Sequence, residues 1–193
     1  PDSPVAPAPL SHAAGSPDYR GASPKMGPSG VYQFYDWRHL DPKAYPIVGG
    51  HAVPMWKDLQ PGQYTYNWTW LNDFLAIDAA MDKTDAVGLD LYDGPCCGGM
   101  GVPDYVFQPY SSARITCSDG EKIPKYWDPG LQQEYGKFIK EFGRQFNGDP
   151  RISFLEVGVG IYGETQPSDD KYDSCVASAG LTSDLWVSYA KWV

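Results

Sequence analysis

The sequence predicts an α/β fold with a parallel sheet, and three observations support this. Segments of strand composition alternate with segments of helical periodicity in the order β, β, α, β, α, β, α. This alternation is typical of parallel strands joined by right-handed helical crossovers. No glycine-rich phosphate loop follows the first predicted strand, which argues against an open dinucleotide-binding sheet. We therefore expect a TIM-type (β/α)8 barrel, of which 193 residues hold only about the first four βα units.

Four segments have the composition of buried strands, and three have the periodicity of amphipathic helices. The strand segments are 31–37 (VYQFYDW), 47–56 (IVGGHAVPMW), which is a shorter strand running into a loop, 86–92 (AVGLDLY) and 152–159 (ISFLEVGV). The helices are 69–83, 128–146 and 182–193. Their predicted caps are Asn67 or Thr69 for the first helix, Asp128 for the second, and Thr182 or Ser183 for the third.

The chain divides into two regions by composition. Residues 1–29 contain 7 of the 18 prolines and many small residues, which is typical of an extended linker or of a tail lying over a domain. Residues 30–193 are expected to form the N-terminal half of the barrel. Within them, the long connection 93–127 holds three of the four Cys together with several Gly and Pro, and a connection of this length is usually functional or cross-linked.

The charge and the aromatic content limit the classes of ligand. With 15 basic and 24 acidic residues the net charge is −9, which argues against nucleic acid and anionic membranes as partners. No apolar run approaches the roughly 20 residues of a membrane span. Aromatic residues reach 15% and charged residues only 20%, a balance that suits an extracellular protein with a surface for stacking sugar rings. An aromatic core with many loops explains the same composition equally well. We expect a secreted protein whose signal peptide lies outside this sequence.

Four cysteines predict at least one disulfide in an oxidising compartment. Adjacent Cys96 and Cys97 are not expected to pair with each other, so Cys117 and Cys175 would be their partners in either of two pairings. No Cys-x-x-Cys spacing or nearby His supports a metal site. Asn67 begins an Asn-Trp-Thr glycosylation sequon.

Three segments, in order, resemble glycoside hydrolases of clan A, especially the β-galactosidase-like type of family 42. The first runs from Trp56 through Pro61-Gly62 and Tyr64 to Trp68, and the second is 102–106 (VPDYV). The third combines 126–129 (YWDP), 147–152 (NGDPRI), 156–158 (EVG) and 162–164 (YGE). The resemblance covers about residues 30–166. Each piece alone is weak, but their order and spacing are fairly specific.

The resemblance implies a (β/α)8 barrel that hydrolyses a glycosidic bond, without a cofactor. The family's acid/base carboxylate follows strand four, which here falls on Glu164. In retaining enzymes a second carboxylate about 5–5.5 Å away is the nucleophile. The family takes it from strand seven, outside this chain, so the chain alone is expected to be inactive. Many relatives carry Asn before the acid/base residue, where this chain has Gly163.

Further residues at predicted strand ends are expected to contact an oligo- or polysaccharide, because barrel active sites lie at the carboxyl ends of the strands. Each has a structural alternative: core packing for a Trp, an internal hydrogen bond for a His, or a turn cap for an Asp. Glu156, inside an apolar strand, is expected to be a buried polar contact. The predicted sugar-binding residues are Trp37, His51, Asp90, Asp93, Tyr162 and Trp127.

Two other functions remain open from the sequence. One is a non-catalytic carbohydrate-binding or degenerate barrel, and the other is a structural or assembly role for an exported fragment. Half a barrel leaves apolar sheet edges exposed, so the remaining half or another chain is expected to cover them. A strand-seven carboxylate beyond Val193 would favour the enzyme.

Overall fold

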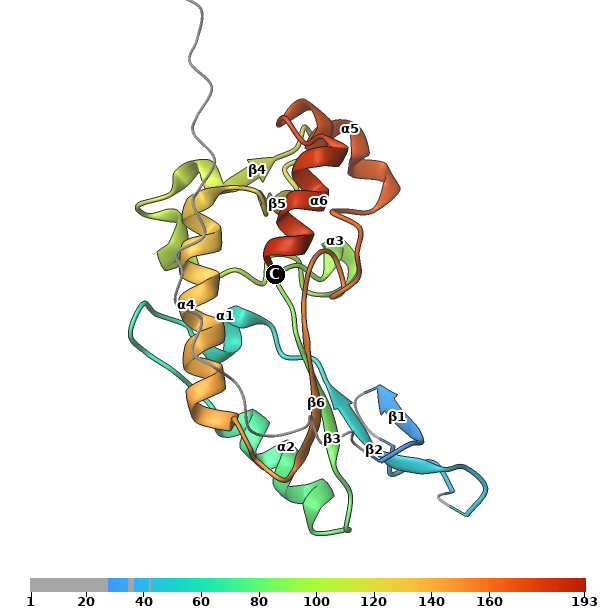
Figure 1. Cartoon of the computed structure of the whole chain (residues 1–193). Coiled ribbons are helices and arrows are strands. Elements are labelled where there is room, and N and C mark those ends of the chain that lie inside the picture. The colour runs from blue at the N-terminus through green and yellow to red at the C-terminus, as the bar shows by residue number, and fades with distance from the viewer. Residues whose placement is uncertain (1–27, 35–36, 42) are drawn as a thin grey trace, which may run out of the picture.

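The fold is described from a computed structural model, over residues 28–34, 37–41 and 43–193. The predicted Pro-rich segment 1–29 lies, apart from its last two residues, outside the described residues. A parallel sheet runs along one side of the molecule, helices pack against it, and a lobe of short elements lies beyond the upper end of the sheet (Figure 1).

The central sheet has four strands in sequential order. They are β1 (Val31–Phe34), β2 (Ile47–Ala52), β3 (Asp85–Leu89) and β6 (Ile152–Val157), and their spatial order is β1-β2-β3-β6. All three strand pairs are parallel. This confirms the predicted order of parallel strands joined by crossovers. The sheet does not close on itself, because β1 and β6 are its edge strands.

Helices α1 (Trp56–Leu59), α2 (Thr69–Ala79) and α4 (Pro129–Phe146) lie on one side of the sheet (Figure 1). The predicted cap of α4 is confirmed, because Asp128 Oδ1 accepts hydrogen bonds from the N–H groups of Gly130 at 2.8 Å and Leu131 at 3.3 Å. The predicted segment 47–56, a short strand running into a loop, contains β2, which ends at Ala52. The helix α1 that begins at Trp56 was not predicted.

The lobe beyond the sheet is built from short elements and one longer helix. It includes α3 (Gly94–Cys97), the 3₁₀ turns η1 (Asp104–Phe107), η2 (Ser111–Ala113) and η3 (Asp170–Tyr172), the antiparallel hairpin of β4 (Arg114–Thr116) and β5 (Lys122–Pro124), α5 (Asp173–Ser178) and α6 (Ser183–Trp192). Thr182 Oγ1 accepts a hydrogen bond from the N–H of Leu185, which confirms the predicted cap of α6. The hairpin within 93–127 was not predicted.

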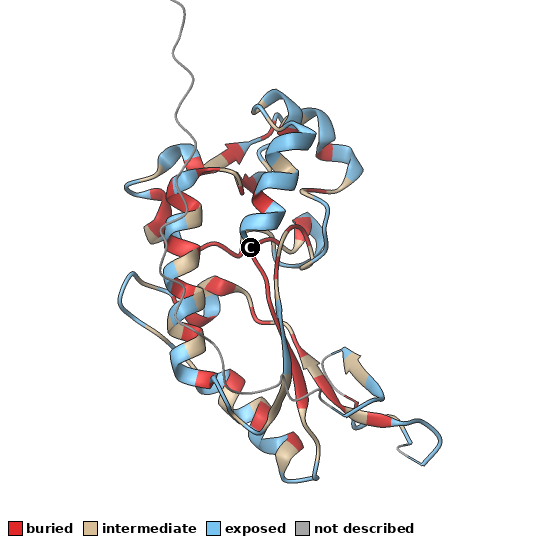
Figure 2. Ribbon diagram, viewed as in Figure 1, coloured by how far each residue is buried: buried red, intermediate tan, exposed pale blue. Residues whose placement is uncertain are grey.

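The core lies between the sheet and the helices. The buried residues run along the inner side of α4 and along the strands that it faces (Figure 2). Trp56 is fully buried, and its ring stacks on Phe138 with centroids 5.5 Å apart. Val87 and Leu89 of β3 point toward this side. Because side chains alternate along a strand, Ala86, Gly88 and Asp90 belong to the opposite face.

Two buried aspartates join β2, β3 and α2. Asp78 and Asp85 are 4% and 1% exposed. The N–H of Gly50 donates to Asp85 Oδ1 at 2.7 Å and to Asp78 Oδ2 at 3.2 Å, and Trp37 Nε1 donates to Asp78 Oδ2 at 2.7 Å. Burial, together with a hydrogen bond to Asp78, raises the pKa of Asp85 to about 8. The Asp85 carboxyl group therefore keeps its proton at neutral pH.

Replacing Asp85 by Asn is expected to change how stability depends on pH. Because the pKa of Asp85 is raised in the folded state, its stabilising contribution is complete below its ordinary pKa of 3.8 and is lost as the pH rises through about 8. The unfolding free energy of the wild type should therefore fall over that window, and Asp85→Asn should flatten the fall. Denaturant titrations across the pH range measure this.

The matched control is Asp73→Asn on the exposed side of α2, which should leave the pH dependence of the wild type unchanged. An Asp85→Asn variant with the slope of the wild type would show that the pKa of Asp85 is not raised in the folded protein.

Candidate functional site

The candidate site lies at the carboxyl ends of β3 and β6. The two segments that follow these strands remain paired. Tyr92 and Ile161 form a parallel bridge, and the N–H of Tyr162 donates to the carbonyl of Tyr92 at 2.9 Å. The turn that carries Glu164 is thus docked against the end of β3. In parallel α/β folds this end of the sheet is where ligands bind.

Glu164 itself is exposed in this turn. Its N–H donates to the carbonyl of Ile161 at 2.9 Å, and its Oε2 accepts a hydrogen bond from Gln166 Nε2 at 3.3 Å. The two preceding residues adopt left-handed backbone conformations, with φ of 56° at Tyr162 and 74° at Gly163. Glycine at position 163 is explained by this conformation, which residues with a side chain rarely adopt.

Asp90 lies directly beneath the turn and is 2% exposed. Its Oδ1 accepts a hydrogen bond from the N–H of Tyr92 at 3.1 Å. Burial raises the pKa of Asp90 to about 6, although the N–H groups of Tyr92, Leu91 and Gly163 act in the opposite direction. Asp93 is partly buried, which raises its pKa, and the charge of Lys57 opposes that rise. The site therefore holds one carboxyl group that titrates close to neutral pH.

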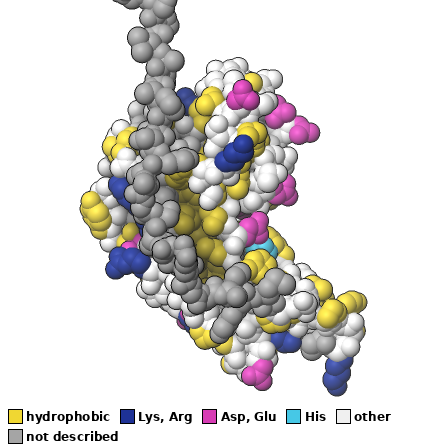
Figure 3. Space-filling view, in the orientation of Figure 1, with side chains coloured by type: hydrophobic (Ala, Val, Ile, Leu, Met, Phe, Trp, Pro, Cys, Tyr) yellow, Lys and Arg dark blue, Asp and Glu magenta, His cyan; other side chains and the backbone are white. Residues whose placement is uncertain are grey.

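The face of the sheet turned away from the helices, here called the open face, carries His51, Phe154 and Glu156. Ala86 of the central strand β3 pairs with His51 of β2 on one side and with Phe154 of β6 on the other. Glu156 lies two residues further along β6 and pairs with Gly88. Glu156 Oε2 is 3.5 Å from His51 Nε2, and the Glu156 side chain is 46% exposed. Burial lowers the pKa of His51, and the charge of Glu156 opposes this. Figure 3 shows apolar side chains with a histidine and an acidic group near the middle of the molecule.

The structure brings some of the predicted sugar-binding residues together and separates others. Asp90, Asp93 and Tyr162 gather around the turn of Glu164, and His51 lies lower on the open face. Trp37 is 5% exposed, and its Nε1 donates a hydrogen bond to Asp78. It therefore packs in the core and does not offer a surface on which a sugar ring could stack. Trp127 is half-buried where β5 leads into α4, with Lys125 Nζ 5.7 Å from its ring centroid.

Glu156 was expected to be a buried polar contact and is instead half-exposed on the open face. The contact between Glu156 and His51 was not predicted. It joins β2 and β6, which are separated by β3, so local spacing carries no sign of it. The alternation of side chains along both strands was the available signal, because it places residues 154 and 156 on the same face.

The adjacent cysteines pair with each other, so the prediction that Cys96 and Cys97 would not is wrong. They lie in α3, which is entered at Gly94 with φ of 63° and followed by Gly98 and Gly99, also at positive φ. These glycines allow chain reversals on both sides of the pair that other residues would resist. Cys96 Sγ is 3.3 Å from the hydroxyl of Tyr162, so this disulfide borders the candidate site.

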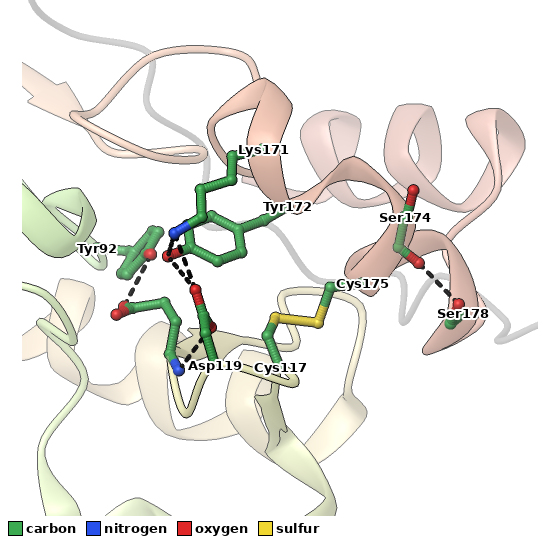
Figure 4. The surroundings of a disulfide bond; sticks show 9 residues. Tyr92, Cys117, Asp119, Lys171, Tyr172, Ser174, Cys175 and Ser178 are labelled. Atoms are coloured by element: carbon green, nitrogen blue, oxygen red, sulfur yellow. Dashed lines mark hydrogen bonds and ion pairs between the residues drawn. A yellow bond between two sulfur atoms is a disulfide. The ribbon is translucent and has the colours of Figure 1, made fainter.

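The second disulfide, Cys117–Cys175, ties the β4–β5 hairpin to α5 across a sequence separation of 58 (Figure 4). Closing a loop of that length stabilises by about 4 kcal/mol in the chain-entropy model. Beside it, Asp119 Oδ2 accepts hydrogen bonds from Lys171 Nζ at 2.9 Å and from the Tyr172 hydroxyl at 3.2 Å. The prediction of at least one disulfide is confirmed.

A groove of about 570 Å³ follows this disulfide between the hairpin and α5. It contains none of the predicted catalytic or sugar-binding residues. Tyr92 links it to the candidate site, because its hydroxyl donates to Glu121 Oε1 in the hairpin at 2.9 Å. Asn67 is exposed, and its side chain accepts a hydrogen bond from the N–H of Thr69 at 3.2 Å.

The described part of the chain contains neither a cluster of metal-binding side chains nor a membrane-spanning helix. Within residues 28–34, 37–41 and 43–193, no group of three or more His, Cys, Asp or Glu side chains is arranged to hold a metal ion. Over the same residues, none of the helices has both the length and the apolar character needed to cross a membrane.

Comparisons with known proteins find partial structural similarity only. No protein-family model and no curated protein matches the chain. Among solved structures, a β-galactosidase from the psychrophilic Marinomonas ef1 has a TM-score of 0.43 and 11% identity, over 55% of this chain and 17% of that chain. The GH42 β-galactosidase Gan42B of G. stearothermophilus has a TM-score of 0.42 and 9% identity, over 55% and 16%. A β-galactosidase from Halorubrum lacusprofundi has a TM-score of 0.44 and 12% identity, over 66% and 20%.

The matched region thus amounts to a fifth or less of each of these proteins. At TM-scores below 0.5, the likeness adds no evidence on what this chain does.

Proposed function

We propose that this chain contributes the acid/base half of a retaining glycosidase site, with Glu164 as the general acid and base. A glycosidic oxygen is a poor leaving group, so its departure needs a positioned proton donor. The nucleophilic carboxylate comes from strands outside residues 1–193. Asp93 and Tyr162 border the sugar next to Glu164.

One observation carries the proposal, namely the docking of the Glu164 turn on the end of β3. The hydrogen bond from Tyr162 to Tyr92 holds the turn at the carboxyl end of the sheet, where it adjoins Asp90. The sequence resemblance to family 42 assigns the acid/base carboxylate to Glu164, which lies in this same turn. The exposure of Glu164 fits a group that must exchange protons with both substrate and water.

The missing carboxylate is proposed to arrive with further strands that pair beside β6. The faces of a parallel sheet that carry apolar side chains are normally covered by helices, yet Leu155 of the edge strand β6 is 38% exposed on the helix side of the sheet, beside Val87. A neighbouring strand with its helix would cover Leu155 on that side. We call this chain together with those strands the assembled protein.

Export to an oxidising compartment is part of the proposal. Both disulfides need an environment that does not reduce them, and such environments are extracellular or within the secretory route. The alternative function, sugar binding without hydrolysis, would use the same open face. It is favoured by one observation, since the Glu164 carboxylate accepts a hydrogen bond from its neighbour Gln166 and, within the described part of the chain, from no side chain of the open face.

Hydrolysis of glycosides tests the proposal. The assembled protein is expected to release sugar from aryl β-galactosides and from oligosaccharides, while the 193-residue chain alone releases none, because the nucleophile is absent. Chromatography of the products measures both. Hydrolysis by the 193-residue chain alone would contradict the assignment of the nucleophile. Binding of sugars by the assembled protein without any hydrolysis would favour the alternative.

A further inference from the structure

Glu156 occupies a distinctive position on the open face. The register of β6 against β3 places it opposite Gly88, one step below the level of Asp90. A Cβ atom built at Gly163 would lie 3.5 Å from Glu156 Oε1, so the carboxylate sits directly under the turn that carries Glu164. Asp90 shares this location, but it is almost fully buried. Glu156 is therefore the carboxylate at this level that a ligand on the open face would meet.

Glycine at position 88 explains how Glu156 reaches His51. The two residues belong to β6 and β2, which flank β3, so their backbones are separated by about 10 Å. A Cβ atom at Gly88 would lie 3.2 Å from His51 Nε2, which is closer than an ordinary contact. The absence of a side chain there leaves the space in which the imidazole and the carboxylate approach to 3.5 Å.

The His51–Glu156 contact leaves hydrogen-bonding capacity unused. His51 Nε2 is buried and makes no hydrogen bond in the described structure, so its approach to Glu156 is an electrostatic contact. Among the residues that the structure describes, none donates a hydrogen bond to the Glu156 carboxylate, whose side chain is 46% exposed. An ionised carboxylate accepts hydrogen bonds strongly, and paired hydroxyl groups are donors that suit it.

The apolar surroundings indicate the shape of that ligand. The ring of Phe154 lies one step below Glu156 on the same face, and the rings of Tyr32 and His51 lie 5.1 Å and 6.4 Å from it, centroid to centroid. An aromatic surface with one carboxylate at its rim suits a pyranose, which has an apolar face and a border of hydroxyls.

We propose that Glu156 is a substrate-binding residue whose carboxylate accepts hydrogen bonds from sugar hydroxyls beneath Glu164, and that His51 is a positioning residue which holds that carboxylate in place. This inference rests on the proposed function and adds a specificity-determining contact to the same site. It assigns no proton transfer to Glu156.

The test compares Glu156→Gln, His51→Gln and Glu141→Gln in the assembled protein, with nitrophenyl β-galactoside and its monodeoxy analogues as probes. A hydrogen bond to a charged group contributes enough that Glu156→Gln should raise KM about tenfold to hundredfold and change kcat less. His51→Gln should raise KM in the same direction by a smaller factor. Glu141→Gln changes a partly exposed carboxylate of α4 that is paired with Arg144, and it should leave KM unchanged.

The deoxy analogues separate a direct contact from a structural effect. The wild type should lose affinity for the analogue that lacks the contacted hydroxyl, and Glu156→Gln should bind that analogue no worse than the parent sugar. A lowered melting temperature with unchanged KM and unchanged discrimination among the analogues would overturn the proposal, because Glu156 would then be only structural.

The outcome also stays separate from that of the proposed function. If the assembled protein hydrolyses none of these probes, the hydrolase assignment fails, and calorimetric titration with lactose replaces KM. The proposal then requires Glu156→Gln to weaken lactose binding by the same tenfold to hundredfold. Lactose binding that is equal in all variants, or absent from the wild type, overturns it.

Discussion

Trp56→Ala is expected to lower the unfolding free energy by about 3–5 kcal/mol. The side chain is fully buried, stacks on Phe138, and contacts Tyr135 with ring centroids 5.3 Å apart. Alanine would leave a cavity between α1 and α4. It would also remove the hydrogen bond that Trp56 Nε1 donates to buried Gln60 at 2.8 Å.

Denaturant titration measures the loss, and Trp70→Ala is the matched control. Trp70 lies on α2 with 46% of its surface exposed, so its removal should cost less than about 1 kcal/mol. A second variant, Trp56→Phe, keeps most of the ring and should lie between the two. Equal losses for Trp56→Ala and Trp70→Ala would show that the core is not organised around Trp56.

Glu164→Gln is expected to slow hydrolysis of natural oligosaccharides by the assembled protein by about 10²–10⁴-fold. Glutamine has nearly the same shape but cannot donate a proton to the leaving oxygen. Because the exposed turn is held by backbone hydrogen bonds, the variant should keep the stability of the wild type.

Two further variants are compared in the same assay, one as a control and one as a contrast. Glu141→Gln changes another partly exposed carboxylate that is paired with Arg144 on α4, and it should retain full activity. Glu156→Gln should mainly raise KM, whereas Glu164→Gln should mainly lower kcat. A Glu164→Gln variant with undiminished kcat on oligosaccharides would exclude Glu164 as the acid.

Patterns within a strand or helix predicted the sheet well. Periodicity located all four parallel strands, and Asp128 with Pro129 marked the start of α4 within one residue. Such signals are local, because a cap or an alternating strand is defined by neighbours in the sequence. Helix α1 was missed because the apolar side chain of Trp56 fits a strand, a loop or a helix, and only its stacking on Phe138 decides which.

The site was less predictable because its contacts join distant segments. The pairing of Cys96 with Cys97 depends on the conformations of the surrounding glycines, which sequence spacing does not specify. Trp37 could not be assigned to the core without its hydrogen bond to Asp78, which is 41 residues away. The approach of His51 to Glu156 likewise requires the register of three strands and the vacant side-chain position at Gly88.

The leaving-group dependence of Glu164→Gln tests the central claim most directly. The measurement compares the rate of the variant, relative to wild type, on an oligosaccharide and on a dinitrophenyl glycoside of the same sugar. If Glu164 supplies the proton, the variant should lose about 10²–10⁴-fold on the oligosaccharide and far less in the first step with dinitrophenolate, which departs without protonation. An equal loss on both substrates, or no loss on either, would contradict the assignment of Glu164 as the general acid.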